Sequence, residues 1–74
     1  KHVQIRYSSL SYYPRASRLA ALIKRDAGVD PEVLGGARGE FSIRVGDEVV
    51  ARKDAGGFPD EDEVLAQVKL ALAR

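Results

Sequence analysis

Apolar and polar residues alternate along two short segments of the chain, residues 2–7 and 41–45. Such alternation is typical of strands that bury one face and expose the other. Residues 48–53 follow the second segment after only Gly46-Asp47, and a two-residue turn of this composition predicts that they pair with residues 41–45 as a tight β-hairpin. A fourth, weaker strand is expected at residues 32–34.

Two further segments have apolar residues at the spacing of an amphipathic helix. We expect the first helix to be capped by Ser11, to hold Pro14 in its first turn and to end before Gly28. Its apolar stripe consists of Ala16, Leu19, Ala20, Ile23 and Ala27. Before the second helix, Asp60 and Glu63 stand at the spacing of a capping box. The residues of this helix that face the core are Val64, Leu65, Val68 and Leu72.

The order of these elements, β-α-β-β-β-α, predicts an α/β fold in a single domain that spans residues 1–74. The first strand, helix and second strand need a crossover and therefore a parallel pair, whereas the hairpin adds antiparallel strands. We expect a thioredoxin-like two-layer sandwich, in which a mixed four-stranded sheet carries two helices on one face. One shared core should contain Val3, Ile5, Leu19, Ile23, Phe41, Ile43, Val68 and Leu72.

Composition changes this picture mainly by what it excludes. The chain has no cysteine and one histidine, which excludes a disulfide, a zinc–thiolate site and an iron–sulfur cluster, so we expect no metal and no cofactor. The 12 basic and 11 acidic residues nearly balance, whereas nucleic-acid-binding proteins carry a strong basic stripe. No apolar run is long enough to span a membrane and no signal peptide is visible, so we expect a cytoplasmic protein with neither nucleic acid nor a membrane as partner.

Three serines mark the one junction at which chemistry is expected. Ser8, Ser9 and Ser11 lie between the end of the first strand and the start of the first helix. Ligands in open α/β sheets tend to bind at the carboxyl ends of strands, and the free N–H groups of a helix start favour an anion. A purely structural interpretation stays open, in which Ser11 caps the helix and the other two serines fill a turn.

The serines stand within a set of motifs that resembles a known family. Tyr7-Ser8-Ser9-Leu10-Ser11, followed by Arg15-Ala16, resembles the Tyr-Cys-x-x-Cys start of the selenoprotein W/T/H-like (Rdx) family. Gly39-Glu40-Phe41-Ser42-Ile43 is similar to the Gly-x-Phe-Glu-Val strand of that family, and Gly46-Asp47 occupies its hairpin turn. Lys53-Asp54-Ala55-Gly56-Gly57-Phe58-Pro59 resembles its Lys-x-x-Gly-Gly-Phe-Pro segment before the last helix.

The resemblance covers nearly the whole chain, from Val3 to Leu72. It implies a thioredoxin-like fold, a thiol- or selenol-based role in cell redox homeostasis, and glutathione, thioredoxin or another redox protein as partner. By position, Ser8 stands where the attacking cysteine would be, and Ser11 where the second cysteine or a selenocysteine would be. We expect Ser8 to be the more exposed of the two. The candidate binding residues around this pair are Tyr7, Ser9, Leu10, Arg15 and Phe58.

The serines are also the main departure from the family. Thiol–disulfide exchange needs a thiolate and a second sulfur, and a serine hydroxyl supplies neither. Activating a hydroxyl would need an adjacent base, and the only histidine, His2, lies back along the first strand. The chain as it stands is therefore predicted to be redox-inactive. Two explanations stay open: the reactive cysteines were replaced by serine, or the chain is a natural non-catalytic protein-binding module on the same scaffold.

Three arginines and three tyrosines close to the first loop are interpreted as a basic, aromatic surface for an anionic peptide or a carboxylate of glutathione, in preference to nucleic acid. They are Arg6, Arg15, Arg18, Tyr7, Tyr12 and Tyr13. The acidic run at residues 60–63 is interpreted as helix capping, not as a metal site. Two placements stay open for Phe58, either on a flexible lid near the first loop or packed under the last helix.

Overall fold

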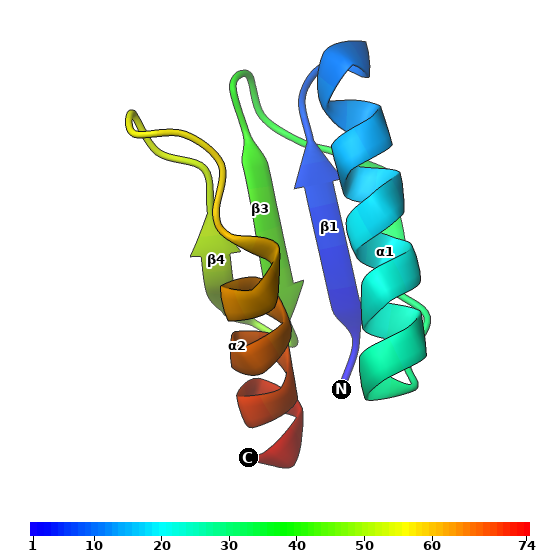
Figure 1. Ribbon diagram of the computed structural model, residues 1–74. Coiled ribbons are helices and arrows are strands. Elements are labelled where there is room, and N and C mark those ends of the chain that lie inside the picture. Colours follow the sequence, from blue (N-terminus) through cyan, green and yellow to red (C-terminus); the bar gives the residue numbers. More distant parts are fainter.

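A computed structural model describes residues 1–74 and contains the predicted elements in the predicted order (Figure 1). The elements are β1 (Val3–Tyr7), the short 3₁₀ helix η1 (Leu10–Tyr12), α1 (Tyr13–Ala27), β2 (Glu32–Gly35), β3 (Phe41–Val45), β4 (Glu48–Arg52) and α2 (Glu61–Ala73). The weak strand candidate after the first helix is thus a strand. Neither long helix has the length and apolar character that crossing a membrane requires.

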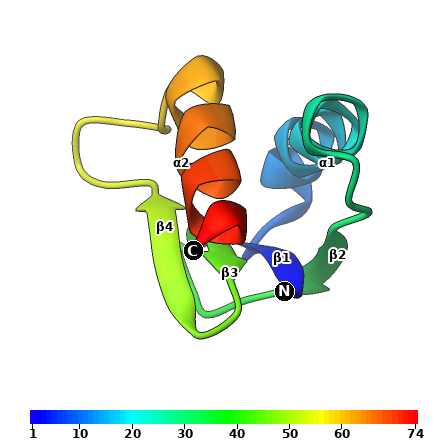
Figure 2. The ribbon, with the colours of Figure 1, turned by 90° about the horizontal axis from the view of Figure 1, so that it is seen from below.

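The four strands form one mixed sheet in the order β2-β1-β3-β4. The central strand β1 is parallel to β2 and antiparallel to β3, and β3 pairs with β4 as the expected hairpin. Figure 2 shows that α1 and α2 lie side by side on the same face of this sheet. The predicted two-layer α/β architecture is therefore confirmed.

The core lies between the sheet and the helices. Cross-strand pairing places the apolar residues of β1 opposite those of β3, and both sets point toward the helices. Seven of the eight predicted core residues are buried; the exception, Leu72, is partly buried and packs against the core. In the last turn of α2 the fully buried residue is Ala71. The remaining core residues from the helices are Ala16, Leu19, Ile23, Val64, Leu65 and Val68.

The start of the first helix differs from the prediction. Ser11 was expected to cap it, but α1 begins at Tyr13 and Ser11 lies inside the preceding 3₁₀ turn, where it caps nothing. The physical reason is a tighter turn, in which the N–H of Tyr12 donates to the carbonyl of Ser9 at 3.0 Å. Pro14 lies in the first turn of α1, and Gly28, with φ of 74°, ends it as expected.

The start of α2 follows the prediction in part. The side chain of Asp60 accepts a hydrogen bond from the N–H of Glu63 at 3.2 Å, which is one half of a capping box. The carboxylate of Glu63 accepts instead from the side-chain amide of Gln67 at 3.1 Å. The three acidic residues of the first turn also favour this end of the helix dipole.

The hairpin turn depends on the backbone of Gly46. This residue has φ of 60°, and its N–H donates to the carbonyl of His2 at 2.8 Å. We expect Gly46→Ala to lower the free energy of unfolding by about 1–2 kcal/mol, because a side chain disfavours positive φ. Urea unfolding measures the loss. Gly35→Ala is the matched control, since Gly35 has no positive φ and open space where the methyl would stand. An equal loss for both variants would contradict this account of the turn.

Ser42 differs in burial from the other polar residues on the outer face of the sheet. It was expected on an open face but is buried, since it lies between Arg6 and Arg52 in the strand register. Its hydroxyl donates to the carboxylate of Glu40. That hydrogen bond, and a second one from the N–H of Ala37 at 2.7 Å, hold the pKa of Glu40 below its ordinary value of 4.5. Arg44 and Arg6 contribute in the same direction.

A carboxyl group with a lowered pKa stabilises the fold above its ordinary pKa, and the contribution is lost as the pH falls through the lowered value. We therefore expect the melting temperature of Glu40→Gln to lie below that of the unmodified chain at neutral pH. The two melting temperatures should converge as the pH falls below the ordinary pKa of 4.5 and Glu40 becomes protonated. Circular dichroism melts over this pH range test the prediction, and parallel curves would show that Glu40 does not contribute through its charge.

Candidate functional site

The serine-containing loop lies where the carboxyl end of β1 meets the start of the first helix, at the top of Figure 1. Ser9, Leu10 and Ser11 are exposed, whereas Ser8 is half-buried. The expectation that Ser8 is the more exposed serine of the predicted pair is therefore wrong, because Ser8 still follows β1 while Ser11 lies on the outward 3₁₀ turn. Leu10 is 85% exposed, the highest value among the large apolar residues.

The hydroxyl that contacts Ser11 is that of Ser9, at an Oγ–Oγ distance of 2.7 Å. Sequence spacing singled out Ser8 and Ser11 as the pair, and it gave no indication that Ser9 would turn toward Ser11. A two-hydroxyl contact at the surface can bind a polar group, but without an adjacent base it cannot generate a nucleophile. Nowhere are three or more histidine, aspartate or glutamate side chains arranged so that they could hold a metal ion.

Aromatic rings join the first loop to the segment that precedes α2. Phe58 packs edge-on against Tyr12, with ring centroids 5.0 Å apart, and against Phe41 at 5.3 Å. Tyr7 and Tyr13 form a second edge-to-face pair at 5.5 Å. Such pairs add to the energy of apolar burial. Phe58 thus lies next to the first loop, as one alternative proposed, but it is half-buried and anchored, not displayed on a free lid.

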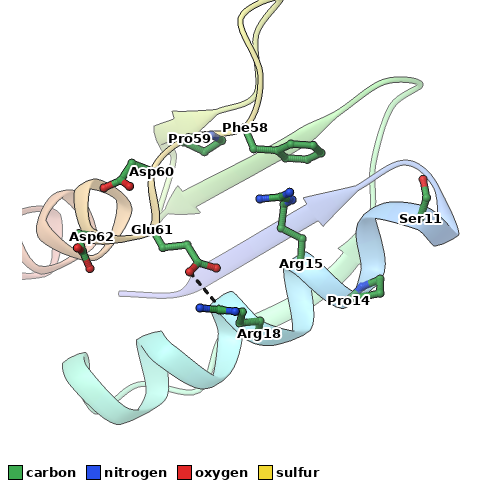
Figure 3. A pocket seen from close by; sticks show the side chains of 9 residues that line it. All are labelled: Ser11, Pro14, Arg15, Arg18, Phe58, Pro59, Asp60, Glu61 and Asp62. Carbon is green, nitrogen blue, oxygen red and sulfur yellow. Dashed lines mark ion pairs between the residues drawn. The ribbon is translucent and has the colours of Figure 1, made fainter.

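A groove of about 890 Å³ opens between the starts of the two helices (Figure 3). Its lining residues are Ser11, Pro14, Arg15, Arg18, Phe58, Pro59, Asp60, Glu61 and Asp62. The guanidinium carbon of Arg15 lies 4.0 Å from the centroid of the Phe58 ring, which is a cation–π contact. Arg18 forms an ion pair with Glu61, with Nε and Oε1 3.2 Å apart, and so connects α1 to α2.

The charges of this groove differ from the predicted basic surface. Arg15 and Arg18 share the groove with three acidic residues, 60–62, of which Glu61 points toward them, so the groove has no positive surplus (Figure 3). Arg6 does not join them, because it alternates with the core residues of β1 and lies on the opposite face of the sheet. The acidic residues at the start of α2 were interpreted only as capping, and no sequence signal placed them opposite the first helix.

No protein-family model and no curated protein matches the chain. Among solved structures, a crystal structure of a selenoprotein W-related protein from Vibrio cholerae is similar, with a TM-score of 0.78 over 95% of each chain and 18% sequence identity. The fold is that of a selenoprotein W-related protein. The family resemblance that the motifs predicted is thereby supported at the level of the fold, which is thioredoxin-like.

The motifs that carry the family resemblance fall at three points of this structure. The serine motif forms the β1–α1 loop, the segment 39–43 enters β3, and the segment 53–59 forms the connection to α2 that carries Phe58. The first and last of these meet through the contact between Tyr12 and Phe58. Of the predicted binding residues, Ser9 and Leu10 are exposed on the loop, Arg15 and Phe58 line the groove, and Tyr7 packs half-buried beside Tyr13.

Proposed function

We propose that the protein is a thiol-free redox scaffold that recognises a partner through its first loop, with Ser8 and Ser11 at the positions of the family's reactive pair. The observation that carries this proposal is an exposed Leu10 in that loop of a chain that has no cysteine. A partner that covers this side chain would remove its apolar surface from water, which favours association. The similar fold of a selenoprotein W-related protein supports the redox origin of the scaffold.

The partner class that we propose is a thioredoxin-like or other redox protein, or glutathione. Leu10 and Tyr13, which are 85% and 47% exposed, supply apolar contact area on the loop and on the first turn of α1. Arg15 lies in the adjoining groove without a carboxylate partner and is held in place by Phe58. A guanidinium positioned in this way binds a carboxylate, such as one of the two in glutathione, with charge-assisted hydrogen bonds.

A second candidate is the thiol–disulfide oxidoreductase itself, for a chain in which cysteines occupy positions 8 and 11. The motif order and the fold favour it. In that reaction one protein thiolate attacks a substrate disulfide and releases one substrate thiol, leaving a mixed disulfide. The second protein thiolate then releases the other substrate thiol, so the protein pair is oxidised as the substrate is reduced. The serine chain cannot perform either step.

Titration with a bacterial thioredoxin and, separately, with reduced glutathione tests the proposed function, with the amide signals of the isotope-labelled protein as readout. We expect shifts in residues 8–15 and near Phe58. Leu10→Ser should weaken thioredoxin binding roughly tenfold, as expected when an apolar contact side chain of an interface is truncated. Leu70→Ser is the matched control, because Leu70 is also exposed but lies on α2. Binding of neither probe, or equal weakening by both substitutions, would refute recognition at this loop.

A further inference from the structure

The face of the sheet opposite the helices carries a group of arginines. Both helices lie on the other face (Figure 2), so this one has no helix over it. The strand register aligns Arg6, Ser42 and Arg52 in one row across β1, β3 and β4. Arg44 lies two residues further along β3, on the same face. Three guanidinium groups therefore surround Ser42 on a surface formed by three adjacent strands.

The basic side chains on this face outnumber the acidic side chains around them. A hollow of about 370 Å³ on this side is lined by Arg38, Arg44, Arg52 and Lys53, and Glu40 is its only acidic residue. Glu40 already accepts hydrogen bonds from the N–H of Ala37 and the hydroxyl of Ser42, and it lies 3.8 Å from a guanidinium nitrogen of Arg44. The ammonium of Lys53 lies toward the Phe58 ring, so it is not counted with this face. Four arginines, Arg6, Arg38, Arg44 and Arg52, then outnumber two carboxylates, that of Glu40 and that of Glu32 beside Arg6. Like charges held this close together favour binding of an anion.

Two of the arginines also have unused hydrogen-bonding groups. The Nε–H groups of Arg6 and Arg44 are buried and have no hydrogen-bond partner within the protein. Arg6 uses one terminal nitrogen to donate to the side-chain oxygen of Gln4 at 3.1 Å, which is a neutral acceptor. A guanidinium is best satisfied by a carboxylate that accepts two parallel hydrogen bonds from it, and neither of these two has such a partner.

We propose that this basic sheet face, formed by Arg6, Arg38, Arg44 and Arg52, binds an extended acidic segment of a partner protein. Adjacent strands are about 4.8 Å apart, so the backbones of Arg6 and Arg52 are separated by about 10 Å, and Arg44 is displaced by about 7 Å along its strand. Alternate side chains of an extended peptide are also about 7 Å apart. A segment with glutamates at alternate positions can therefore reach two guanidiniums at once.

The observations favour a peptide over a nucleic acid. Binding of single-stranded nucleic acid relies on aromatic side chains on which bases stack. The aromatic rings of this chain pack on the helix side or at the first loop, where they contact one another, and none lines the basic hollow except the buried Phe41 beneath it. The basic sheet face offers guanidinium groups without a stacking platform.

Fluorescence anisotropy with a labelled octapeptide of alternating glutamate and threonine tests the proposal. A peptide with glutamine in place of glutamate is the uncharged control. At low salt we expect the acidic peptide to bind, with an affinity that falls as salt rises, and the glutamine peptide not to bind. Arg52→Glu should weaken binding at least roughly tenfold, since a charge-assisted hydrogen bond is replaced by repulsion. Lys69→Glu, an equal change of charge on the exposed side of α2, should leave binding unchanged.

Arg52→Gln provides a second variant if the charge reversal impairs folding, and it should weaken binding less than Arg52→Glu. Absence of binding at low salt, or equal weakening by Arg52→Glu and Lys69→Glu, would overturn the proposal. Tighter binding of a single-stranded RNA of equal charge would assign the face to nucleic acid instead. Sedimentation showing self-association that Arg52→Glu removes would assign it to the acidic run 60–63 of a second copy, and would also overturn the peptide proposal.

Discussion

Leu19→Ala is expected to remove about 2–5 kcal/mol from the free energy of unfolding. Leu19 is 2% exposed and lies on the face of α1 that packs against the sheet. Truncation removes its burial energy and leaves a cavity that the neighbouring side chains fill only in part. Since a domain of this size has a total stability of only about 5–10 kcal/mol, the variant should be partly unfolded at moderate temperature. Urea unfolding followed by circular dichroism measures the loss.

Leu70→Ala is the matched control for this prediction. It deletes the same atoms from a helix, but Leu70 is 57% exposed, so the change in unfolding free energy should remain within about 0.5 kcal/mol. Similar losses for the two variants would mean that the core does not lie between the helices and the sheet.

Periodicity explains how much of the fold was predictable from the sequence. Alternation with a period of two placed Val3 and Ile5 on the buried face of β1, and helical spacing placed Leu19 and Ile23 on the buried face of α1. The period of the apolar residues matches the side-chain geometry of a strand or a helix, so the pattern alone identifies the buried face. The end of α2 was less well predicted, because Ala71 and Leu72 are both apolar and only the final packing decides which one is buried.

The site was less predictable, because its contacts join segments far apart in the sequence. The motif order located the first loop, but the ion pair of Arg18 with Glu61 and the stacking of Arg15 on Phe58 depend on how the two helices pack. The separation of Arg6 from these arginines follows from strand alternation, and could have been inferred by assigning its face before grouping it with them. The hydroxyl contact of Ser9 results from a 3₁₀ turn that capping rules did not predict.

The double variant S8C/S11C is expected to change the chemistry of the protein from no thiol reactivity to reduction of a disulfide. The unmodified chain has no sulfur and should release no thiol from an aromatic disulfide reagent. The reduced double variant should release two substrate thiols per chain and end as an internal disulfide. S8C alone should release one and remain a mixed disulfide, because no second thiol is present to resolve it. Absorbance of the released thiol and the mass of the product distinguish these outcomes.

The most direct test of the central proposal, that positions 8 and 11 of the first loop correspond to the reactive pair of the family, is competition between two alternative pairs. S8C/S11C and S9C/S11C are each equilibrated with the same mixture of reduced and oxidised glutathione and quenched with acid. Mass spectrometry then distinguishes the reduced, glutathionylated and internally disulfide-bonded forms. S9C/S11C is the matched control, because the two hydroxyls at these positions are in contact at 2.7 Å. A disulfide needs Cα atoms about 4.4–6.8 Å apart with suitably directed side chains. The account predicts an internal disulfide in S8C/S11C under conditions in which S9C/S11C remains reduced or glutathionylated. Closure of S9C/S11C while S8C/S11C stays open would contradict it.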